Sequence, residues 1–196
     1  GTALHAREAF RLLWGAELEA GQLQCPVPQG GTSPLEHNCS GKHAAFLASC
    51  RQLHWPLESY LQPDHPLQQQ VRKRVAELLG LPEAELVSCR DDCGAPTLQL
   101  QLSQMALLFA HLGAGAQADL ERLSRAMLAH PELVAGEGRF DTELMRLGHG
   151  QVLSKGGAEG IQCLSRVGEG LGVAIKVEDG SSRAKHAVAL QLLEQL

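Results

Sequence analysis

The residues with the most chemical potential form one short run, His37-Asn38-Cys39-Ser40-Gly41-Lys42-His43. A glycine and a lysine at the start of a predicted helix first suggest a phosphate-binding loop. That motif requires an earlier glycine, where Glu36 stands, and a Ser or Thr after the lysine, where His43 stands. The run therefore does not predict nucleotide binding.

The same run offers ligands for a metal ion. Three residues separate Cys39 from His43, a spacing that one helical turn could use, and Cys89 and Cys93 repeat that spacing. No CxxC…CxxC framework is present. The alternative to a metal site is an ordinary helix N-terminus, at which the Asn and Ser side chains have hydrogen-bond partners. Spacing alone favours this alternative.

Two lysines could serve nucleophilic chemistry, in which a lysine of lowered pKa takes the proton of a serine hydroxyl. The Ser-x-x-Lys match from Ser182 to Lys185 follows Asp179-Gly180, which favours a helix cap and a solvated lysine. Lys155 stands at the end of a predicted strand beside Gly156-Gly157, where glycines would let a substrate carbonyl approach closely. A turn between strands explains this second pattern equally well.

A pair of carboxylates, Asp91 and Asp92, precedes Cys93-Gly94 in a predicted tight turn after a strand. Such carboxylates are usually solvated turn formers. They could also hold a lysine or orient a metal ligand.

Helices precede strands along the chain, which predicts an α+β fold with an antiparallel sheet and argues against a doubly wound parallel sheet. Residues 21–38 are predicted to form a loop, because they are rich in Gly, Pro and polar residues. The predicted helices span Ala6 to Ala20, Gly41 to Leu53, Pro66 to Leu79, Ser103 to Gly113, Ala118 to Ala129, a short segment after Asp141, and Ser182 to Leu196. The predicted strands span Leu86 to Ser88, Leu98 to Leu102, Val152 to Ser154, Ile161 to Val167 and Leu171 to Glu178.

Capping residues and apolar stripes orient these helices. Asp64, Ser103 and Asp141 are predicted N-caps, and Gly80 is predicted to end the helix from Pro66 to Leu79. Periodicity predicts a buried stripe of Val71, Val75, Leu78 and Leu79 in that helix, and a sheet-covering face of Val188, Leu192 and Leu196 in the last one.

Composition excludes several classes of protein. The 196 residues carry 17 Lys and Arg against 22 Asp and Glu, a net charge of −5, which gives no electrostatic reason to expect nucleic-acid or membrane binding. No stretch approaches the ~18 consecutive apolar residues of a membrane-spanning helix. Six cysteines without a signal sequence predict reduced thiols in a cytoplasm, with Cys50 and Cys163 as buried apolar residues. Few aromatic residues predict an aliphatic core.

Several segments in this order closely resemble the L-asparaginase II family of bacteria, the thermolabile, rhizobial-type class, from about residue 25 to the C-terminus. These segments are Asn38 to His43, Asp64-His65-Pro66-Leu67-Gln68, Asp91 to Pro96, His130 to Gly136 with Gly138 to Thr142, and Lys155 with Gly157 to Gly160. The resemblance implies a fold similar to serine β-lactamases and glutaminases. It also implies hydrolysis of the L-asparagine side-chain amide, a small-molecule substrate, and an assembly compatible with a homodimer.

The resemblance also implies roles for single residues. Cys39, Lys42 and Cys93 match the zinc ligands of the family, and the lysine amine must lose its proton to bind. His43 and Asp91 match polar neighbours of that site and are expected to assist catalysis. Lys155 is expected to assist as well, because it matches an active-site lysine that lies late in the family's sequence. Ser40, Gly41 and Gly157 are expected to line the substrate pocket.

Part of the family pattern is missing. The family's Ser-x-x-Lys pair and its second serine precede the matched region, and this chain contains neither in that context. Gly156 and Asp92 are smaller departures from the family pattern. The family often has a larger residue at the position of Gly156, and it usually has glycine at the position of Asp92. Together with the absence of an initiator Met, this predicts the C-terminal portion of one asparaginase II-type domain over residues 1–196, inactive alone. A non-catalytic zinc- or ligand-binding module, a pseudoenzyme subunit and a β-lactamase- or peptidase-like acylase are the alternatives.

Overall fold

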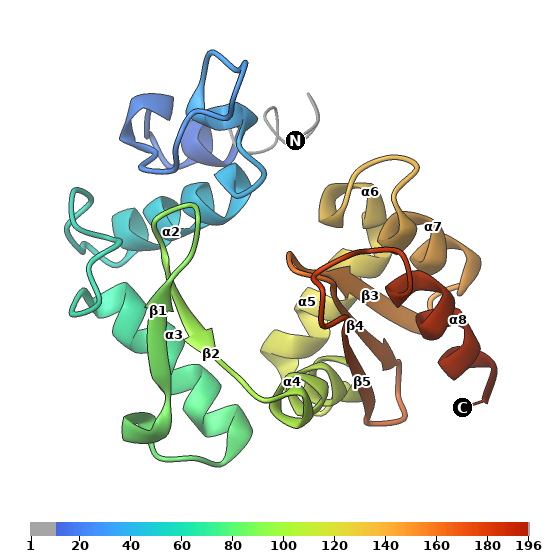
Figure 1. Ribbon diagram of the computed structural model, residues 1–196. Helices are drawn as coiled ribbons and strands as arrows, with labels where there is room; N and C mark the ends of the chain where they lie inside the picture. The colour runs from blue at the N-terminus through green and yellow to red at the C-terminus, as the bar shows by residue number, and fades with distance from the viewer. Residues whose placement is uncertain (1–10, 196) are drawn as a thin grey trace. The chain divides into compact units, whose positions relative to one another are not determined.

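The computed structural model describes residues 11–195, and the chain divides into two compact units at Gln99 and Leu100 (Figure 1). All strand pairs in the described part are antiparallel, and helices accompany both sheets, so the predicted α+β class is confirmed. None of the described helices is both long and apolar enough to cross a membrane. That both units belong to one larger domain of β-lactamase-like fold stays a prediction.

The described part of the first unit begins with helical residues 11–15, so this helix ends before the predicted Ala20. The Leu18 N–H bonds the Leu13 carbonyl at 2.8 Å and Glu17 takes a positive φ of 56°. This is the hydrogen-bond pattern of a Schellman ending, which stops the helix before Ala20. The predicted residues 6–10 lie outside the described residues.

Two longer helices and a hairpin follow in the first unit. Helix α2 covers Ser40–Gln52 and α3 covers Pro66–Leu79, each within one residue of its prediction. The hairpin pairs β1 (Val87–Arg90) with β2 (Pro96–Gln99). Short 3₁₀ turns, η1 (Ala20–Gln22), η2 (Pro34–Glu36) and η3 (Glu83–Glu85), occupy the connections.

Helix α3 corrects two expectations. Its N-cap is His65, whose Nδ1 accepts the Leu67 N–H at 3.1 Å, and not Asp64. Its fully buried residues include Leu67 and Ala76, whereas Val71 is 39% exposed. The other members of the predicted stripe are half-buried. Gly80 ends the helix with a positive φ of 65°, as predicted.

The core of the first unit joins helix α2 to the turn of the hairpin. Leu47 and Cys50 of α2 pack in one cluster with Cys93 and Ala95 of the turn, and all four are at most 1% exposed. Tyr60 is also fully buried there, so the core is not purely aliphatic. The cluster fixes the hairpin turn against α2.

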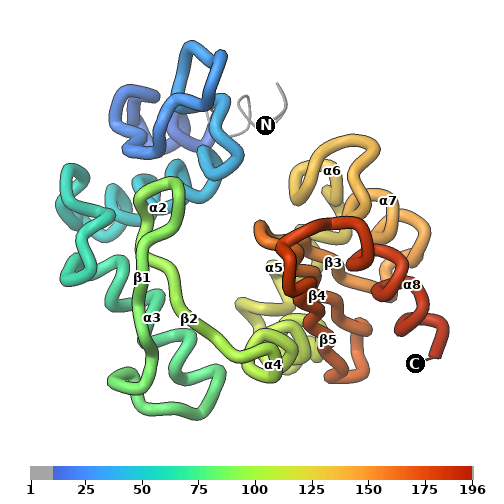
Figure 2. Tube along the Cα trace, in the orientation of Figure 1, coloured from blue at the N-terminus to red at the C-terminus, as the bar shows by residue number. Residues whose placement is uncertain are grey.

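The second unit is built on a sheet of β3 (Val152–Gly156), β4 (Ile161–Arg166) and β5 (Leu171–Lys176), in that spatial order. Figure 2 follows the three strands as neighbours, and the predicted hairpin of the last two is confirmed. The helices are α4 (Leu102–Ala114), α5 (Ala118–Ala129), α6 (Pro131–Val134), α7 (Phe140–Leu147) and α8 (Lys185–Gln195).

Helices cover both faces of this sheet. Ala189 of α8 packs with Leu164 of β4 in one apolar cluster, whereas Leu112 of α4 packs with Leu153 of β3 in another. Helix α4 approaches very closely, because a Cβ added at Gly172 of β5 would collide with the backbone of α4. Residues alternating along the strands thus face opposite helical layers.

Three details in this unit differ from the predictions. Helix α4 begins at Leu102 and its N-cap is Gln101, not Ser103, so the preceding strand ends at Gln99. The N-cap of α7 is Arg139, and Asp141 lies inside the first turn. In α8, Val188 is 41% exposed while Ala189 is buried, so the sheet-covering face is shifted by one residue. Leu196 lies outside the described residues.

Candidate metal centre

The N-terminus of helix α2 presents two of the predicted zinc ligands. A tight turn leads into the helix, since His37 Nδ1 accepts the Cys39 N–H at 3.0 Å and the His37 carbonyl accepts the Ser40 N–H at 3.0 Å. Cys39 is the N-cap residue and Lys42 lies in the first turn. Residues three apart on a helix are neighbours on its surface, so the two side chains share one side.

The turn between β1 and β2 presents the other two polar groups of the site. The Asp91 N–H bonds the Ala95 carbonyl at 2.9 Å, and Asp91 Oδ1 accepts the Asp92 N–H at 2.8 Å. Gly94 has the positive φ of 83° that closes the turn. Asp92 does not need a positive φ, so an aspartate fits at this position. Cys93 is thereby held with its side chain in the core, 1% exposed.

Helix and turn bring four ligand groups together. The side-chain ligand atoms of Cys39, Asp91 and Cys93 all lie within 4.8 Å of one another. Lys42 Nζ lies 3.2 Å from Asp91 Oδ2, and Cys93 Sγ donates to the same oxygen at 3.8 Å. This group of two sulfurs, one amine and one carboxylate could hold a metal ion.

Burial and the neighbouring charges keep Cys39 and Lys42 protonated, whereas they keep Asp91 ionised. Burial raises the pKa of Cys39 to about 11, with Cys93 and Asp91 acting in the same direction and Lys42 against it. Burial alone would lower the pKa of Lys42, but the two thiols and Asp91 outweigh burial and raise it. The N–H groups of Asp92 and Lys42 lower the pKa of Asp91 against the effect of burial. Metal binding would therefore release protons and strengthen as the pH rises.

The donor chemistry of this group fits zinc. Thiolate sulfur with nitrogen or oxygen in a set of four is the usual tetrahedral donor set of Zn²⁺. Hard cations such as Mg²⁺ and Ca²⁺ take oxygen ligands, so two sulfurs disfavour them.

His43 and Ser40 point away from this group, into the interior. Tyr60 Oη accepts the Gln24 N–H at 2.8 Å and is hydrogen-bonded to His43 Nδ1 at 2.7 Å. Burial lowers the pKa of His43 to about 4, which keeps the ring neutral. His43 Nε2 and Ser40 Oγ are buried without a hydrogen-bond partner among the described residues. Gly41, which lies between Ser40 and Lys42 in the sequence, is exposed.

Lys155 and Gly157 belong to the second unit. Lys155 is exposed on β3, and its Nζ donates to the Gly156 carbonyl at 2.6 Å. Gly157 follows the strand and its N–H bonds the Ile161 carbonyl at 2.9 Å. A Cβ at Gly157 would approach Ile161 Cβ to 3.0 Å, so a larger residue fits poorly there.

The carboxylate of Asp141 holds the strand that carries Lys155. Oδ1 accepts the Ser154 hydroxyl at 2.6 Å and the Gln162 amide at 2.7 Å, while Oδ2 accepts the Gly156 N–H at 2.7 Å. Both chain neighbours of Lys155 are thus tied to one buried group. Asp141 is predicted only as a cap, and the structure gives it this longer-range role instead.

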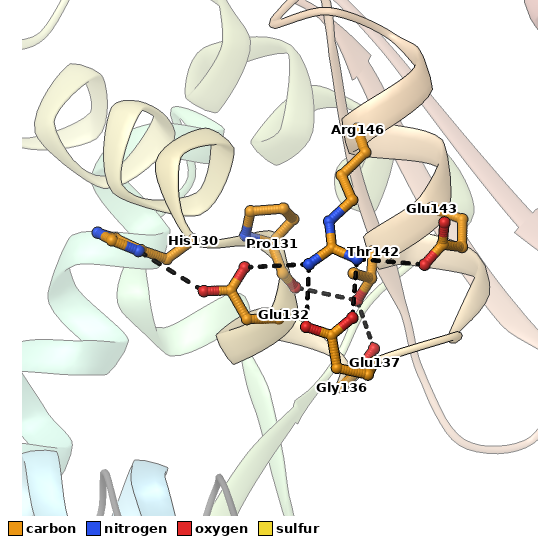
Figure 3. A network of polar contacts seen from close by, with 8 residues as sticks. All are labelled: His130, Pro131, Glu132, Gly136, Glu137, Thr142, Glu143 and Arg146. Atoms are coloured by element: carbon orange, nitrogen blue, oxygen red, sulfur yellow. Dashed lines mark hydrogen bonds and ion pairs between the residues drawn. The ribbon is translucent and has the colours of Figure 1, made fainter.

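A polar network fixes the segment that leads to Asp141 (Figure 3). Arg146 bonds Glu137 at 2.7 Å and lies 3.7 Å from Glu132, which joins α7 to the preceding turn and to α6. Thr142 Oγ1 donates to the Gly136 carbonyl at 2.6 Å and lies 3.1 Å from the Pro131 carbonyl. These contacts hold the residues of the His130–Thr142 motif together as one structural unit.

The Ser-x-x-Lys match near the C-terminus is not a solvated cap, because Lys185 is 8% exposed. Its Nζ donates to the Ile161 carbonyl at 3.2 Å and lies 3.5 Å from the Gly157 carbonyl. Ser182 itself is exposed. This lysine therefore binds the β3–β4 loop, and the hydrogen bonds found for it do not go to the serine.

Sequence reasoning missed Tyr60 in the first unit and Gln162 in the second, and it expected the buried Lys185 to be solvated. These three side chains bond partners far away along the chain, so no local pattern marks the contacts. Tyr60 is the single tyrosine of the sequence, which is the one signal that could have singled it out.

No curated protein sequence matches the chain. The sequence model of one family, described as L-asparaginase II, matches residues 1–196. The match confirms the resemblance carried by the motifs and extends it over all residues of the chain. The family's name indicates hydrolysis of an amide in a small molecule. Because the match covers far more than half of the sequence, the chain belongs to the L-asparaginase II family.

Proposed function

We propose that the chain binds one zinc ion through Cys39, Lys42 and Cys93, as part of a protein that hydrolyses the side-chain amide of L-asparagine to aspartate and ammonia. The observation that carries the metal assignment is the cluster of ligand atoms from the α2 N-terminus and the hairpin turn. Membership of the family supports the reaction, and the motif resemblance supports asparagine as the substrate.

Asp91 suits the role of a partner for the lysine ligand. An amine that gives its lone pair to a metal keeps two N–H bonds, and Asp91 Oδ2, 3.2 Å from Lys42 Nζ, is placed to accept one. The same oxygen faces the Cys93 thiol at 3.8 Å and can receive its proton. When bound, zinc would supply a Lewis acid that anchors the pocket or polarises a carbonyl. Partners of this kind fix the orientation of metal ligands.

The remaining predicted site residues have supporting parts in this proposal. His43 anchors helix α2 from the interior through Tyr60, which keeps the ligands of the first turn in place. Gly41 is exposed beside Lys42 and leaves room for a substrate, with Ser40 behind it. In the second unit, Lys155 would move a proton, and Gly157 would admit the substrate.

The acyl-forming serine is the part that this sequence does not supply. Its Ser-x-x-Lys match, from Ser182 to Lys185, places the lysine on the β3–β4 loop carbonyls. A serine is a weak nucleophile unless an adjacent base takes its proton. We therefore expect these 196 residues alone to release little or no ammonia from L-asparagine.

Metal analysis of the purified chain tests the zinc assignment. About one zinc per chain is expected, with a loss of most of it in Cys39→Ser and in Cys93→Ser. Cys89→Ser is the matched control, because Cys89 is exposed on β1 and lies outside the ligand group, so its zinc content should not change. Unchanged zinc in both ligand variants would contradict the assignment.

An ammonia-release assay with L-asparagine tests the catalytic part. Robust turnover by the chain alone would contradict the expectation of a missing nucleophile. Binding of L-asparagine in a calorimeter without ammonia release would support it. Zinc binding with no affinity for L-asparagine would favour a non-catalytic metal-binding module instead.

A further inference from the structure

Two of the six cysteines lie close enough to react with each other. Cys39 Sγ and Cys93 Sγ lie within 4.8 Å of each other. Cys39 is partly exposed at the N-cap of α2, whereas Cys93 is buried in the hairpin turn. The pair thus combines one sulfur that a small oxidant can reach with a second sulfur directly behind it.

We propose that Cys39 and Cys93 form an oxidation site, at which a peroxide converts the two thiols to a disulfide that excludes a metal ion. The part of this inference that concerns the metal rests on the proposed function, because there the same two sulfurs are the zinc ligands. The pairing of the sulfurs itself requires no metal. The site would then exist in a reduced, metal-binding form and an oxidised, metal-free form.

The reaction balances with hydrogen peroxide as the oxidant. Cys39 Sγ loses its thiol proton and attacks one peroxide oxygen, so that an S–O bond forms and the O–O bond breaks, and the thiol proton joins the departing hydroxide as the first water. Cys93 Sγ then attacks the sulfur of this sulfenic acid, the S–S bond forms, and the S–O bond breaks to release the second water. Two thiols and one peroxide give one disulfide and two waters, with two electrons passing from sulfur to oxygen.

The neighbouring charges suit the second step. Asp91 Oδ2 faces the Cys93 thiol at 3.8 Å and can accept its proton. Lys42 Nζ lies 3.2 Å from the same oxygen and can protonate the departing hydroxide. The two groups that would assist a metal therefore also assist formation of the disulfide.

The other cysteines near the site are less suited to pairing. Cys25 is 5% exposed and its Sγ donates to the Pro34 carbonyl at 3.5 Å, so this thiol already has a hydrogen-bond partner. Cys89 is exposed but lies outside the group of close ligand atoms. An exposed thiol without a nearby partner oxidises to sulfinic and sulfonic acids and does not form an internal disulfide.

Peptide mapping of the full 196-residue chain tests the proposal. The metal is removed with a chelator, the chain is treated with hydrogen peroxide, free thiols are alkylated, and cross-linked peptides are identified by mass spectrometry. The Cys39–Cys93 peptide pair should be the main cross-link. It should persist in Cys89→Ser and vanish in Cys39→Ser. After excess peroxide is removed, the oxidised chain should bind less than about one tenth of the zinc of the reduced chain, and dithiothreitol should restore binding.

Three outcomes would overturn the proposal. They are a chain without a Cys39–Cys93 cross-link, a Cys25–Cys93 cross-link in its place, and an oxidised chain that still binds its full zinc. A reduced chain that takes up no zinc yet yields the predicted cross-link would contradict the proposed function and support the sulfur pairing. The two ideas therefore fail separately.

Discussion

Asp91 Oδ2 lies 3.2 Å from Lys42 Nζ, and this ion pair connects the β1–β2 turn with the first turn of helix α2. The two side chains are 42% and 37% exposed, so the pair itself contributes little to stability. Its importance lies in placement, because it brings the amine of Lys42 to the two thiols of the candidate metal centre.

Replacement of Lys42 by arginine tests whether the amine is a ligand. Lys42→Arg keeps a positive charge opposite Asp91, but a guanidinium cannot lose its proton to bind a metal. Zinc affinity, measured by competition with a chelator of known affinity, should fall at least about tenfold. Lys73→Arg, on the exposed side of α3, is the matched control and should leave the affinity unchanged. Equal affinities in both variants would mean that Lys42 is not a ligand.

Removal of the Tyr60 hydroxyl should destabilise the first unit. Tyr60→Phe leaves the Gln24 N–H and His43 Nδ1 without their shared partner, and such a loss costs about 2 kcal/mol. Both tryptophans, Trp14 and Trp55, lie in this unit, so their fluorescence during urea unfolding reports its stability.

Ser49→Ala is the control for the tyrosine variant. The Ser49 hydroxyl donates to the Ala45 carbonyl of its own helix at 2.8 Å, in an exposed position. Its removal should change the free energy of unfolding by less than about 0.5 kcal/mol. A similar value for Tyr60→Phe would show that the buried hydroxyl contacts contribute nothing.

The neutral state of His43 should make the first unit acid-sensitive. Burial lowers the pKa of His43 from its ordinary 6.5 to about 4, so the unfolded chain binds a proton in this range that the folded chain excludes. The stability contributed by neutral His43 is full above pH 6.5 and is lost as the pH falls from 6.5 towards 4. Between pH 7 and pH 5 this loss amounts to roughly 2 kcal/mol.

A glutamine variant isolates this pH dependence. In His43→Gln the difference in unfolding free energy between pH 7 and pH 5 should shrink by that amount, because glutamine does not titrate. His54→Asn removes an exposed histidine and should leave the difference as it is in the unmodified chain. An unchanged pH dependence in His43→Gln would contradict a buried, neutral histidine.

The sequence predicts those parts of the fold that depend on residues close together along the chain, and it fails where distant residues decide the structure. Helix α5 is predicted to the residue, Ala118–Ala129, and the strands of the second unit to within two residues, because their periodicity is local. The N-caps are predicted wrongly at Asp64, Ser103 and Asp141. The Asp141 carboxylate, for example, bonds strands β3 and β4, and no local pattern can indicate such partners.

The candidate site divides in the same way. The motif resemblance points to Cys39, Lys42 and Cys93, and the structure brings Cys39 and Cys93 together with Asp91. The spacing of Cys39 and His43, by contrast, suggests a shared metal, whereas the structure has His43 bonded to Tyr60 in the core. Helical spacing defines a common side of a helix, but tertiary packing decides which residues on it are buried.

Asp141 should be essential for the second unit. Asp141→Ala leaves the Ser154 hydroxyl, the Gln162 amide and the Gly156 N–H without a buried acceptor, at a cost of about 3 kcal/mol or more. Amide exchange of the β3 peptide, followed by mass spectrometry, should accelerate at least tenfold. Asp179→Ala, which breaks an exposed ion pair with Arg183, should leave that exchange unaltered. Slow β3 exchange in Asp141→Ala would show that the carboxylate is dispensable.

X-ray absorption at the zinc edge of the reduced, zinc-loaded chain tests the metal centre most directly. Two sulfur neighbours are expected at about 2.3 Å, with nitrogen or oxygen neighbours at about 2.0–2.1 Å. Cys93→Ser, loaded at high zinc, should lose one of the two sulfur neighbours. A spectrum with no sulfur neighbour, or with four, would contradict a site built from Cys39, Lys42 and Cys93.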